Sequence, residues 1–259
     1  MYPTRSARAL LLLSFAGTAA VAGIVGRERG AAQTPHSTSV RTGEQVVADP
    51  LKVVELFQSQ GCSSCPPANA NVNALAVARG DVLALSYGVT YWDRLGWTDT
   101  FARPEFTARQ WEYARARGRR NVWTPQVYVN GGEDLVGANA GQLATAVGRA
   151  RTLPPTLQTA PDSVVVAAGA APRGGADILL VRYEPRSIAV PIRAGENGGR
   201  TLPHRNIVRQ LVKVGRWTGS AVSVVLPASP RPELAQAVLL QQGPGGPILA
   251  AARIARRRL

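Results

Sequence analysis

Cys62 and Cys65 are the residues of this chain whose type and spacing point most directly to chemistry. They are the only two cysteines among 259 residues, and Ser63 and Ser64 separate them. Two thiols at this spacing can close a small disulfide if a helix begins between them. Such a small ring restrains little unfolded chain, so it adds less stability than a long cross-link. We therefore interpret the pair as a redox site whose disulfide opens and closes.

Three other interpretations of the cysteine pair stay open at this point. A closed zinc site usually needs four Cys or His ligands, and the chain offers only His36 and His204 besides the cysteines. Copper(I) suits soft thiolates, so the two cysteines with His204 could bind this ion. The pair could also be an inert structural disulfide. For the redox interpretation no cofactor is expected.

The roles of the two thiols follow from their expected place at the start of a helix. A helix N-terminus has unpaired N–H groups and a positive dipole end, which favour the reactive thiolate. Cys62, at the turn, is predicted to be the nucleophile, and Cys65 the resolving thiol. Pro66 and Pro67 complicate this prediction, because proline is tolerated only in the first turn of a helix. The helix could therefore start at Pro66, with Cys65 as its cap.

Two further features are candidates for the same site. Thr124-Pro125 precedes a predicted strand, and a cis bond there would present the backbone of Thr124 to an extended substrate. The alternative is a trans proline that opens an edge strand. The dipeptide alone does not decide between them, but with the cysteine pair upstream we predict the cis bond. Glu55 lies in the middle of the strand before the cysteines, where a buried carboxyl could pass protons during exchange. Alternatively, Glu55 reaches solvent at a strand edge.

Aromatic residues are dense in the segment between residues 87 and 106. Some must belong to the core, because aromatic rings bury large apolar areas. A long loop after the carboxyl end of a strand is nevertheless where α/β folds place ligand contacts. We predict that Trp92, Trp97 and Trp123 line a substrate cleft over the disulfide.

The elements that must position these residues change character near residue 155. From residue 51, strands predicted at 53–57, 81–87 and 126–129 alternate with helices at 68–78, 104–117 and 139–149, which indicates an α/β sheet. After Pro154-Pro155, short strand-like runs separated by turn residues indicate an all-β sandwich. These runs are 163–167, 177–183, 187–192, 207–214, 221–226, 235–241 and 248–252. We predict an α/β domain at 51–153 and a smaller β domain at 160–255.

The N-terminus has the pattern of a secretory signal. Arg5 and Arg8 precede an uncharged apolar stretch at residues 9–26, which charged residues end. We predict a signal peptide at 1–30, a polar linker at 31–50, and a periplasmic or secreted protein. An uncleaved signal would be the only membrane anchor. Export would place the cysteines where disulfides persist.

The chain carries a net charge of +14, but nothing in the sequence indicates a nucleic-acid partner. Only two of its 30 basic residues are lysines, and this arginine bias fits a biased genome composition as well as a binding site. No recognisable nucleic-acid module accompanies the basic clusters. The expected partners are the thiols and disulfides of other proteins. The oligomeric state stays open.

Three segments carry a resemblance to a known family, at residues 53–67, 124–131 and 195–208. They resemble a family of exported bacterial proteins catalogued as a domain of unknown function (DUF1223-like, with a CSSCPP string). The resemblance implies a thioredoxin-like fold and a thiol–disulfide site, but no substrate. We therefore expect an α/β thioredoxin-like domain followed by a smaller all-β, sandwich-like domain.

The chain also departs from thioredoxins, and its C-terminal signature has polar residues of its own. Its Ser-Ser dipeptide, its Pro-Pro and its lack of a tryptophan before the first cysteine leave the direction of electron flow open. Glu196, Asn197, Arg200 and His204 could form a polar site, or they could cap turns. A thiol–disulfide oxidoreductase is the first hypothesis, with a copper(I)-binding protein or a non-enzymatic interaction protein as alternatives.

Overall fold

The computed structural model describes residues 45–152 and 155–255 of the chain. The predicted signal peptide (1–30), most of the predicted linker and His36 lie outside these residues. None of the helices within the described ranges is long and apolar enough to cross a membrane.

The helices and strands before residue 150 lie close to their predicted positions. They are β2 (Lys52–Gln58), α1 (Cys65–Ala78), β3 (Val82–Gly88), α2 (Pro104–Ala116), β4 (Gln126–Val129) and α3 (Ala140–Arg149). Local chemistry explains these bounds. Pro104 occupies the first turn of α2, where its missing N–H costs no hydrogen bond. Asn139 caps α3, since its side chain accepts a hydrogen bond from the Gln142 N–H at 3.0 Å.

The predicted strands after residue 155 are confirmed as well. They are β7 (Ser163–Val166), β8 (Ala176–Glu184), β9 (Ile188–Pro191), β11 (Ile207–Trp217), β12 (Val222–Val225), β13 (Ala235–Gln241) and β14 (Ile248–Ile254). Sequence patterns do not indicate five short elements. These are β1 (Val46–Val47), β5 (Asp134–Leu135), β6 (Leu157–Ala160), β10 (Thr201–His204) and the 3-10 helix η1 (Asp93–Leu95).

The predicted fold class, an α/β thioredoxin-like domain followed by a smaller β sandwich, is wrong. The described residues are mostly β, with 14 strands in three sheets and three α-helices. The largest sheet has eight strands in the order β14-β13-β8-β11-β3-β2-β4-β5, so it combines strands from before and after residue 155. β11 joins β3 in parallel, with Ile207 opposite Ser86. A free edge of β3 would expose unpaired N–H and C=O groups, and β11 covers it.

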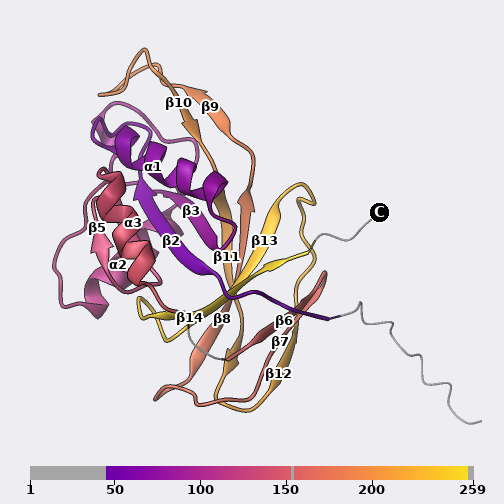
Figure 1. The fold of residues 1–259 in the computed structure, drawn as a ribbon. Coiled ribbons are helices and arrows are strands. Elements are labelled where there is room, and N and C mark those ends of the chain that lie inside the picture. The colour runs from indigo at the N-terminus through magenta and orange to yellow at the C-terminus, as the bar shows by residue number, and fades with distance from the viewer. Residues whose placement is uncertain (1–44, 153–154, 256–259) are drawn as a thin grey trace, which may run out of the picture. The chain divides into compact units, whose positions relative to one another are not determined.

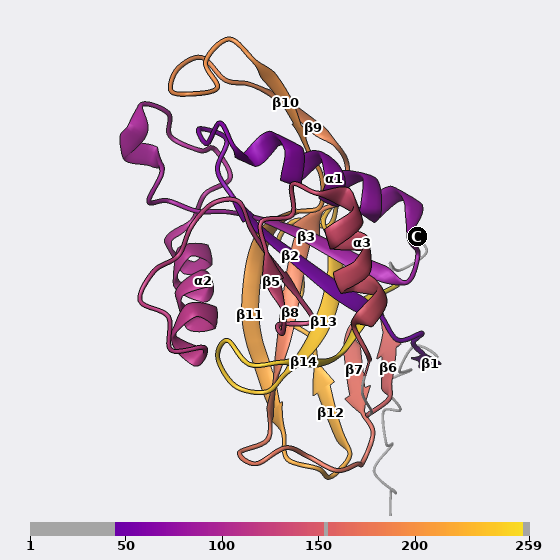
Figure 2. The same cartoon turned by 60° about the vertical axis from the view of Figure 1, so that its left-hand side comes forward.

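The strands of this sheet are covered differently on their two faces (Figures 1 and 2). Helices α1 and α3 pack with the β2 residues Val54 and Leu56. Helix α2 packs with the β2 residues Val53 and Phe57, on the opposite face. The four-stranded sheet β1-β6-β7-β12 packs against residues of β8 and β13. A two-stranded sheet, β9 and β10, forms a hairpin that runs toward α1 (Figure 1).

Candidate functional site

The two cysteines lie in the turn between β2 and α1. Their sulfurs are at disulfide distance, and their Cα atoms are 5.4 Å apart. Both side chains are buried, at 0% exposure for Cys62 and 2% for Cys65, whereas Ser63 and Ser64 between them are exposed. The exposed Ser63-Ser64 dipeptide is therefore the part of the turn nearest to solvent, while the sulfurs themselves are covered.

The helix that follows begins one residue earlier than the prolines suggested. Ser64 is the N-cap and Cys65 is the first residue of α1. Its N–H donates to the Cys62 carbonyl at 3.2 Å, and Pro66 and Pro67 have no N–H. The first turn therefore offers fewer free donors to a thiolate than an ordinary helix does. The Ser64 hydroxyl, 3.2 Å from the Cys62 sulfur, can supply one.

The Thr124-Pro125 segment lies beside this turn, and its peptide bond is cis, as predicted. The Ser64 hydroxyl is 3.5 Å from the Thr124 carbonyl, to which it can donate a long hydrogen bond in place of the one to the Cys62 sulfur. Thr124 and Pro125 are both buried. Two of the predicted site segments, 60 residues apart in sequence, are thus in contact.

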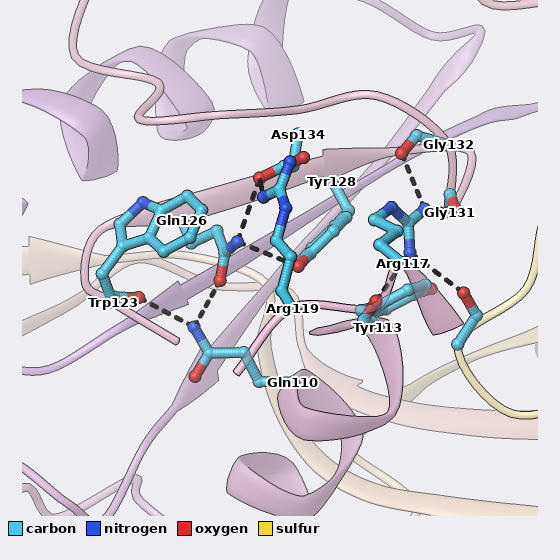
Figure 3. A network of polar contacts seen from close by, with 11 residues as sticks. Gln110, Tyr113, Arg117, Arg119, Trp123, Gln126, Tyr128, Gly131, Gly132 and Asp134 are labelled. Carbon is cyan, nitrogen blue, oxygen red and sulfur yellow. Dashed lines mark hydrogen bonds and ion pairs between the residues drawn. The ribbon is translucent and has the colours of Figure 1, made fainter. Parts of the chain in front are cut away.

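A network of hydrogen bonds involves Trp123 and Gln126, the residues on either side of the Thr124-Pro125 segment (Figure 3). Gln110 on α2 donates to the Trp123 carbonyl and to the Gln126 side chain, both at 2.8 Å. Gln126 in turn donates to the Tyr128 hydroxyl at 2.9 Å and to Asp134 at 3.1 Å. These bonds join α2, β4 and β5 around the proline, so they hold the backbone of this segment in place.

Two of the three predicted cleft tryptophans lie next to the cysteine turn. A Cβ built on Gly61 would be 3.2 Å from a ring carbon of Trp92 and 3.5 Å from Cβ of Trp97. The Trp97 indole donates to the Gln60 side chain at 2.9 Å. Trp123 packs differently, because the Arg119 guanidinium lies over its ring at 5.4 Å. A role of these rings in substrate binding stays a prediction.

Glu55 points to the α2 face of the sheet, away from the face that packs against α1. Its carboxylate accepts two hydrogen bonds from Arg109, at 2.8 and 3.1 Å, and a short one from the Tyr113 hydroxyl. Glu55 is therefore neither at a strand edge nor exposed. The structure brings it together with an arginine rather than with the cysteines, and its proton-transfer role stays a prediction.

The hairpin between β9 and β10 contributes contacts to the cysteine turn that the sequence analysis left undecided. We call its residues 194–199 the cap loop. Asn197, fully buried, donates to the Gln60 carbonyl at 2.9 Å and to the Cys62 carbonyl at 2.8 Å. Glu196 accepts from the Ser63 N–H at 2.9 Å and from its hydroxyl at 2.8 Å. These hydrogen bonds lower the pKa of Glu196.

A second polar group, Asp99, supports the cysteine turn from the tryptophan-rich segment. Its carboxylate accepts from the N–H of Gln60 at 2.7 Å and from the N–H of Phe101 at 2.7 Å. Burial raises the pKa of Asp99 to about 6. The sequence analysis did not single out this residue. Only its place just after the tryptophans could have suggested it.

His204 lies near the start of α1, where it contacts Asn69 and Phe101 rather than the cysteines. Its Nδ1 is 3.3 Å from the Asn69 amide nitrogen, and its ring packs edge-on against Phe101 at 5.6 Å. Burial lowers its pKa to about 4. Among residues 45–152 and 155–255, no group of three or more His, Cys, Asp or Glu side chains could hold a metal ion. The third ligand that the copper(I) hypothesis assigns to His204 therefore does not join the cysteines.

Comparisons with known proteins identify the family of the chain. No curated protein sequence matches it. Among solved structures, it is similar to protein AGR_C_4864 from Agrobacterium tumefaciens, with 34% identity and a TM-score of 0.66 over 82% of this chain and 97% of that one. It also shares a fold with HBP35 of Porphyromonas gingivalis, at 10% identity and a TM-score of 0.51 over 81% of this chain and 76% of that one. The model of the family described as "Protein of unknown function (DUF1223)" matches residues 53–241, and the chain therefore belongs to this family.

Proposed function

We propose that this protein exchanges its Cys62–Cys65 disulfide with the thiols of partner proteins. The observation that carries the proposal is the position of the pair. The only two cysteines of the chain are at disulfide distance, at the first turn of a helix. The dipeptide between them is exposed, and the Thr124 carbonyl is within reach of Ser64. A bridge that served stability alone would gain little from so short a loop.

The proposed reaction begins with a partner thiolate that attacks the sulfur of Cys62. The disulfide between Cys62 and Cys65 breaks, a mixed disulfide forms between the partner and Cys62, and Cys65 leaves as a thiolate. A second partner thiolate then attacks the partner sulfur of the mixed disulfide and releases Cys62. The partner loses two electrons and two protons, and the cysteine pair gains them. In the opposite direction the reduced pair would reduce a partner disulfide.

Access to Cys62 is the main requirement of this proposal. Its sulfur is buried, and the cap loop contacts the backbone on both sides of it through Glu196 and Asn197. Glu196 is exposed, so its bonds to Ser63 compete with water and break at little cost. A partner that displaces Glu196 can pair with the exposed Ser63-Ser64 backbone and reach the sulfur.

We further propose that the exchange takes place outside the cytoplasm. The predicted secretory signal supports this location, since a disulfide persists in exported proteins. Fractionation of cells that express the full chain would test it. Recovery in the cytoplasmic fraction would contradict it.

The decisive measurement is the reduction potential of the cysteine pair, from equilibration against thiol buffers. A value of about −120 to −200 mV would indicate an oxidant or isomerase, and a value near −270 mV a reductant. A value below about −300 mV would mark a structural bridge and contradict the proposal.

Two variants complete this test. Cys65→Ser should trap partner proteins on Cys62 as mixed disulfides that reductant releases. Cys62→Ser should trap none if Cys62 is the attacked residue. Equal trapping by both variants would contradict the separate roles assigned to Cys62 and Cys65. It would still support disulfide exchange by the pair. Tight copper(I) binding by the reduced wild type, lost in Cys62→Ser, would favour the metal hypothesis instead.

A further inference from the structure

A cavity lined by four arginines lies away from the cysteine turn. It has a volume of about 290 Å³ and opens between the start of α2, strands β8 and β11, and the segment before β13. Its charged lining residues are Arg103, Arg182, Arg209, Arg231 and Glu105. One carboxylate thus faces four guanidinium groups.

Arg182, in the middle of β8, is the most unusual of these arginines. Its residue is 3% exposed, and its hydrogen bonds go only to neutral oxygens. They run to the side chains of Gln236 at 3.2 Å and Gln210 at 2.5 Å, and to the Pro227 carbonyl. Burial lowers its pKa. A buried cation is costly unless a negative charge compensates it, and here no carboxylate among its partners does so.

Arg209 lies beside it, at an irregularity in the pairing of β11 with β8. Bulges of this kind redirect side chains. The Arg209 guanidinium stacks over the Phe101 ring at 4.4 Å, and its Nε is buried without a hydrogen-bond partner. Burial lowers its pKa, and the nearby Arg231 and Arg103 lower it further, although the carboxylates of Glu184 and Asp99 partly offset this. The stacked ring holds the guanidinium in place but supplies no full negative charge.

The carboxylates near the cavity have other partners. Glu184 is paired with Arg186 at 2.8 Å, and Glu233 with Arg231 at 2.7 Å. Asp99 accepts from two backbone N–H groups, and the exposed Glu105 stands at the rim. Within the described ranges, no ion pair joins Arg103, Arg182 or Arg209 to a carboxylate.

We infer that this cavity binds a small ligand through a carboxylate or phosphate group. Guanidinium groups bind both anions through paired N–H···O bonds, and a half-buried cavity strengthens such bonds. The cavity is larger than one phosphate ion needs and is near the lower limit of small-molecule sites. Leu234, in its wall, can contact the apolar part of an organic anion.

Titration calorimetry with inorganic phosphate, and separately with citrate, tests this inference at constant ionic strength. We expect saturable binding of at least one probe, and the tighter probe identifies the preferred group. Arg209→Gln should weaken binding about tenfold, since one charge-assisted bond is worth about 1.4 kcal/mol or more. Arg149→Gln is the matched control, because it removes the same charge from an exposed position on α3. Binding by this control should be unchanged.

Two results would overturn the inference: no saturable binding of either probe, or equal weakening in Arg149→Gln and Arg209→Gln. If Arg209→Gln does not fold, Arg231→Gln at the exposed rim serves in its place. Bound anion should also raise the melting temperature of the wild type more than that of the variant. Since the site does not involve the cysteines, Cys62→Ser should bind the probes like the wild type.

Discussion

The Cys62–Cys65 turn and the Glu55–Arg109 pair are both buried, but they are held in different ways. Arg109 makes two hydrogen bonds to Glu55, a third to Gln241 at 3.0 Å and a fourth to Tyr113 at 3.0 Å. These partners come from α2, β2 and β13, which are core elements of the fold. Every contact in this region therefore ties the packed interior together.

The cysteine turn is held by contacts of another kind. Its backbone receives hydrogen bonds from Asn197 and donates one to the exposed carboxylate of Glu196. Both residues belong to the loop between β9 and β10, and we expect this loop to open at a lower free-energy cost than the core elements. Burial of charged or reactive groups therefore does not by itself mark a functional site. The buried pair whose surroundings can open is the better candidate, and the four predictions below test this distinction.

The largest effect is expected at the ion pair. Glu55→Gln should lower the free energy of unfolding by about 3–5 kcal/mol, because it leaves the Arg109 charge buried without its partner. Urea unfolding measures the change. The double variant Glu55→Leu/Arg109→Met should recover most of the loss, and a loss in the double variant as large as in Glu55→Gln would show that the charges themselves are not the cause. In folded Glu55→Gln, a wild-type rate of disulfide exchange would contradict the predicted proton-transfer role of Glu55, and a slower rate would support it.

The second prediction concerns His204, which lies near the cysteine turn and should make the free energy of unfolding depend on pH. Its pKa of about 4 in the folded state lies below the ordinary value of 6.5, so its contribution to stability is present above pH 6.5 and lost as the pH falls to 4. The difference in unfolding free energy between the wild type and His204→Phe should therefore change by about 3 kcal/mol across this window.

Asp99 makes stability depend on pH in the opposite direction to His204. This contribution of Asp99 should become measurable in His204→Phe. The pKa of Asp99 is raised to about 6 from 3.8, so its contribution is present below pH 3.8 and lost as the pH rises through 6. Without His204, stability should fall as the pH rises from 4 to 6. A pH-independent difference between the wild type and His204→Phe would contradict the assignment of a buried, neutral histidine.

A smaller effect is expected at the cap loop. Asn197→Ala removes two buried hydrogen bonds to backbone carbonyls and should cost about 1–3 kcal/mol of stability. It should also speed the reduction of the disulfide by dithiothreitol, because the cap loop is released from the Cys62 backbone. Asn121→Ala, an exposed asparagine, is the control. A reduction rate equal to that of the control would mean that the cap loop does not limit access.

The smallest effect is expected for Glu196→Gln. Its side chain keeps one oxygen acceptor for the Ser63 N–H but loses the charge, so the reduction rate should rise less than in Asn197→Ala. Since its pKa is lowered, the contact persists above the ordinary value of 4.5 and weakens only as the pH falls below it. The rate of disulfide reduction by a phosphine, which acts at acidic pH, measures both effects. Glu133→Gln, at an exposed position, is the control. A larger effect than that of Asn197→Ala would reverse the order of importance within the cap loop.

The sequence alone determined the positions of the main helices and strands and identified Cys62 and Cys65 as the candidate reactive pair. Alternating and helical periods located the main strands and helices within a few residues, because these patterns reflect contacts of each segment with its own surroundings. The spacing of Cys62 and Cys65 was recognisable for the same reason, since a small disulfide is a local geometry. The dipeptide Thr124-Pro125 alone left cis and trans equally open, and only the cysteine pair upstream favoured the cis bond that the structure has.

Only the tertiary structure decided which of these segments meet. The pairing of β11 with β3 joins residues about 120 positions apart, and no local pattern encodes the partner of a strand edge. The same holds for the partner of Glu55, for the cap loop over Cys62, and for the arginine cavity, each assembled from distant segments. Periodicity records whether a side chain is buried, but the identity of its neighbour depends on how the sheets pack.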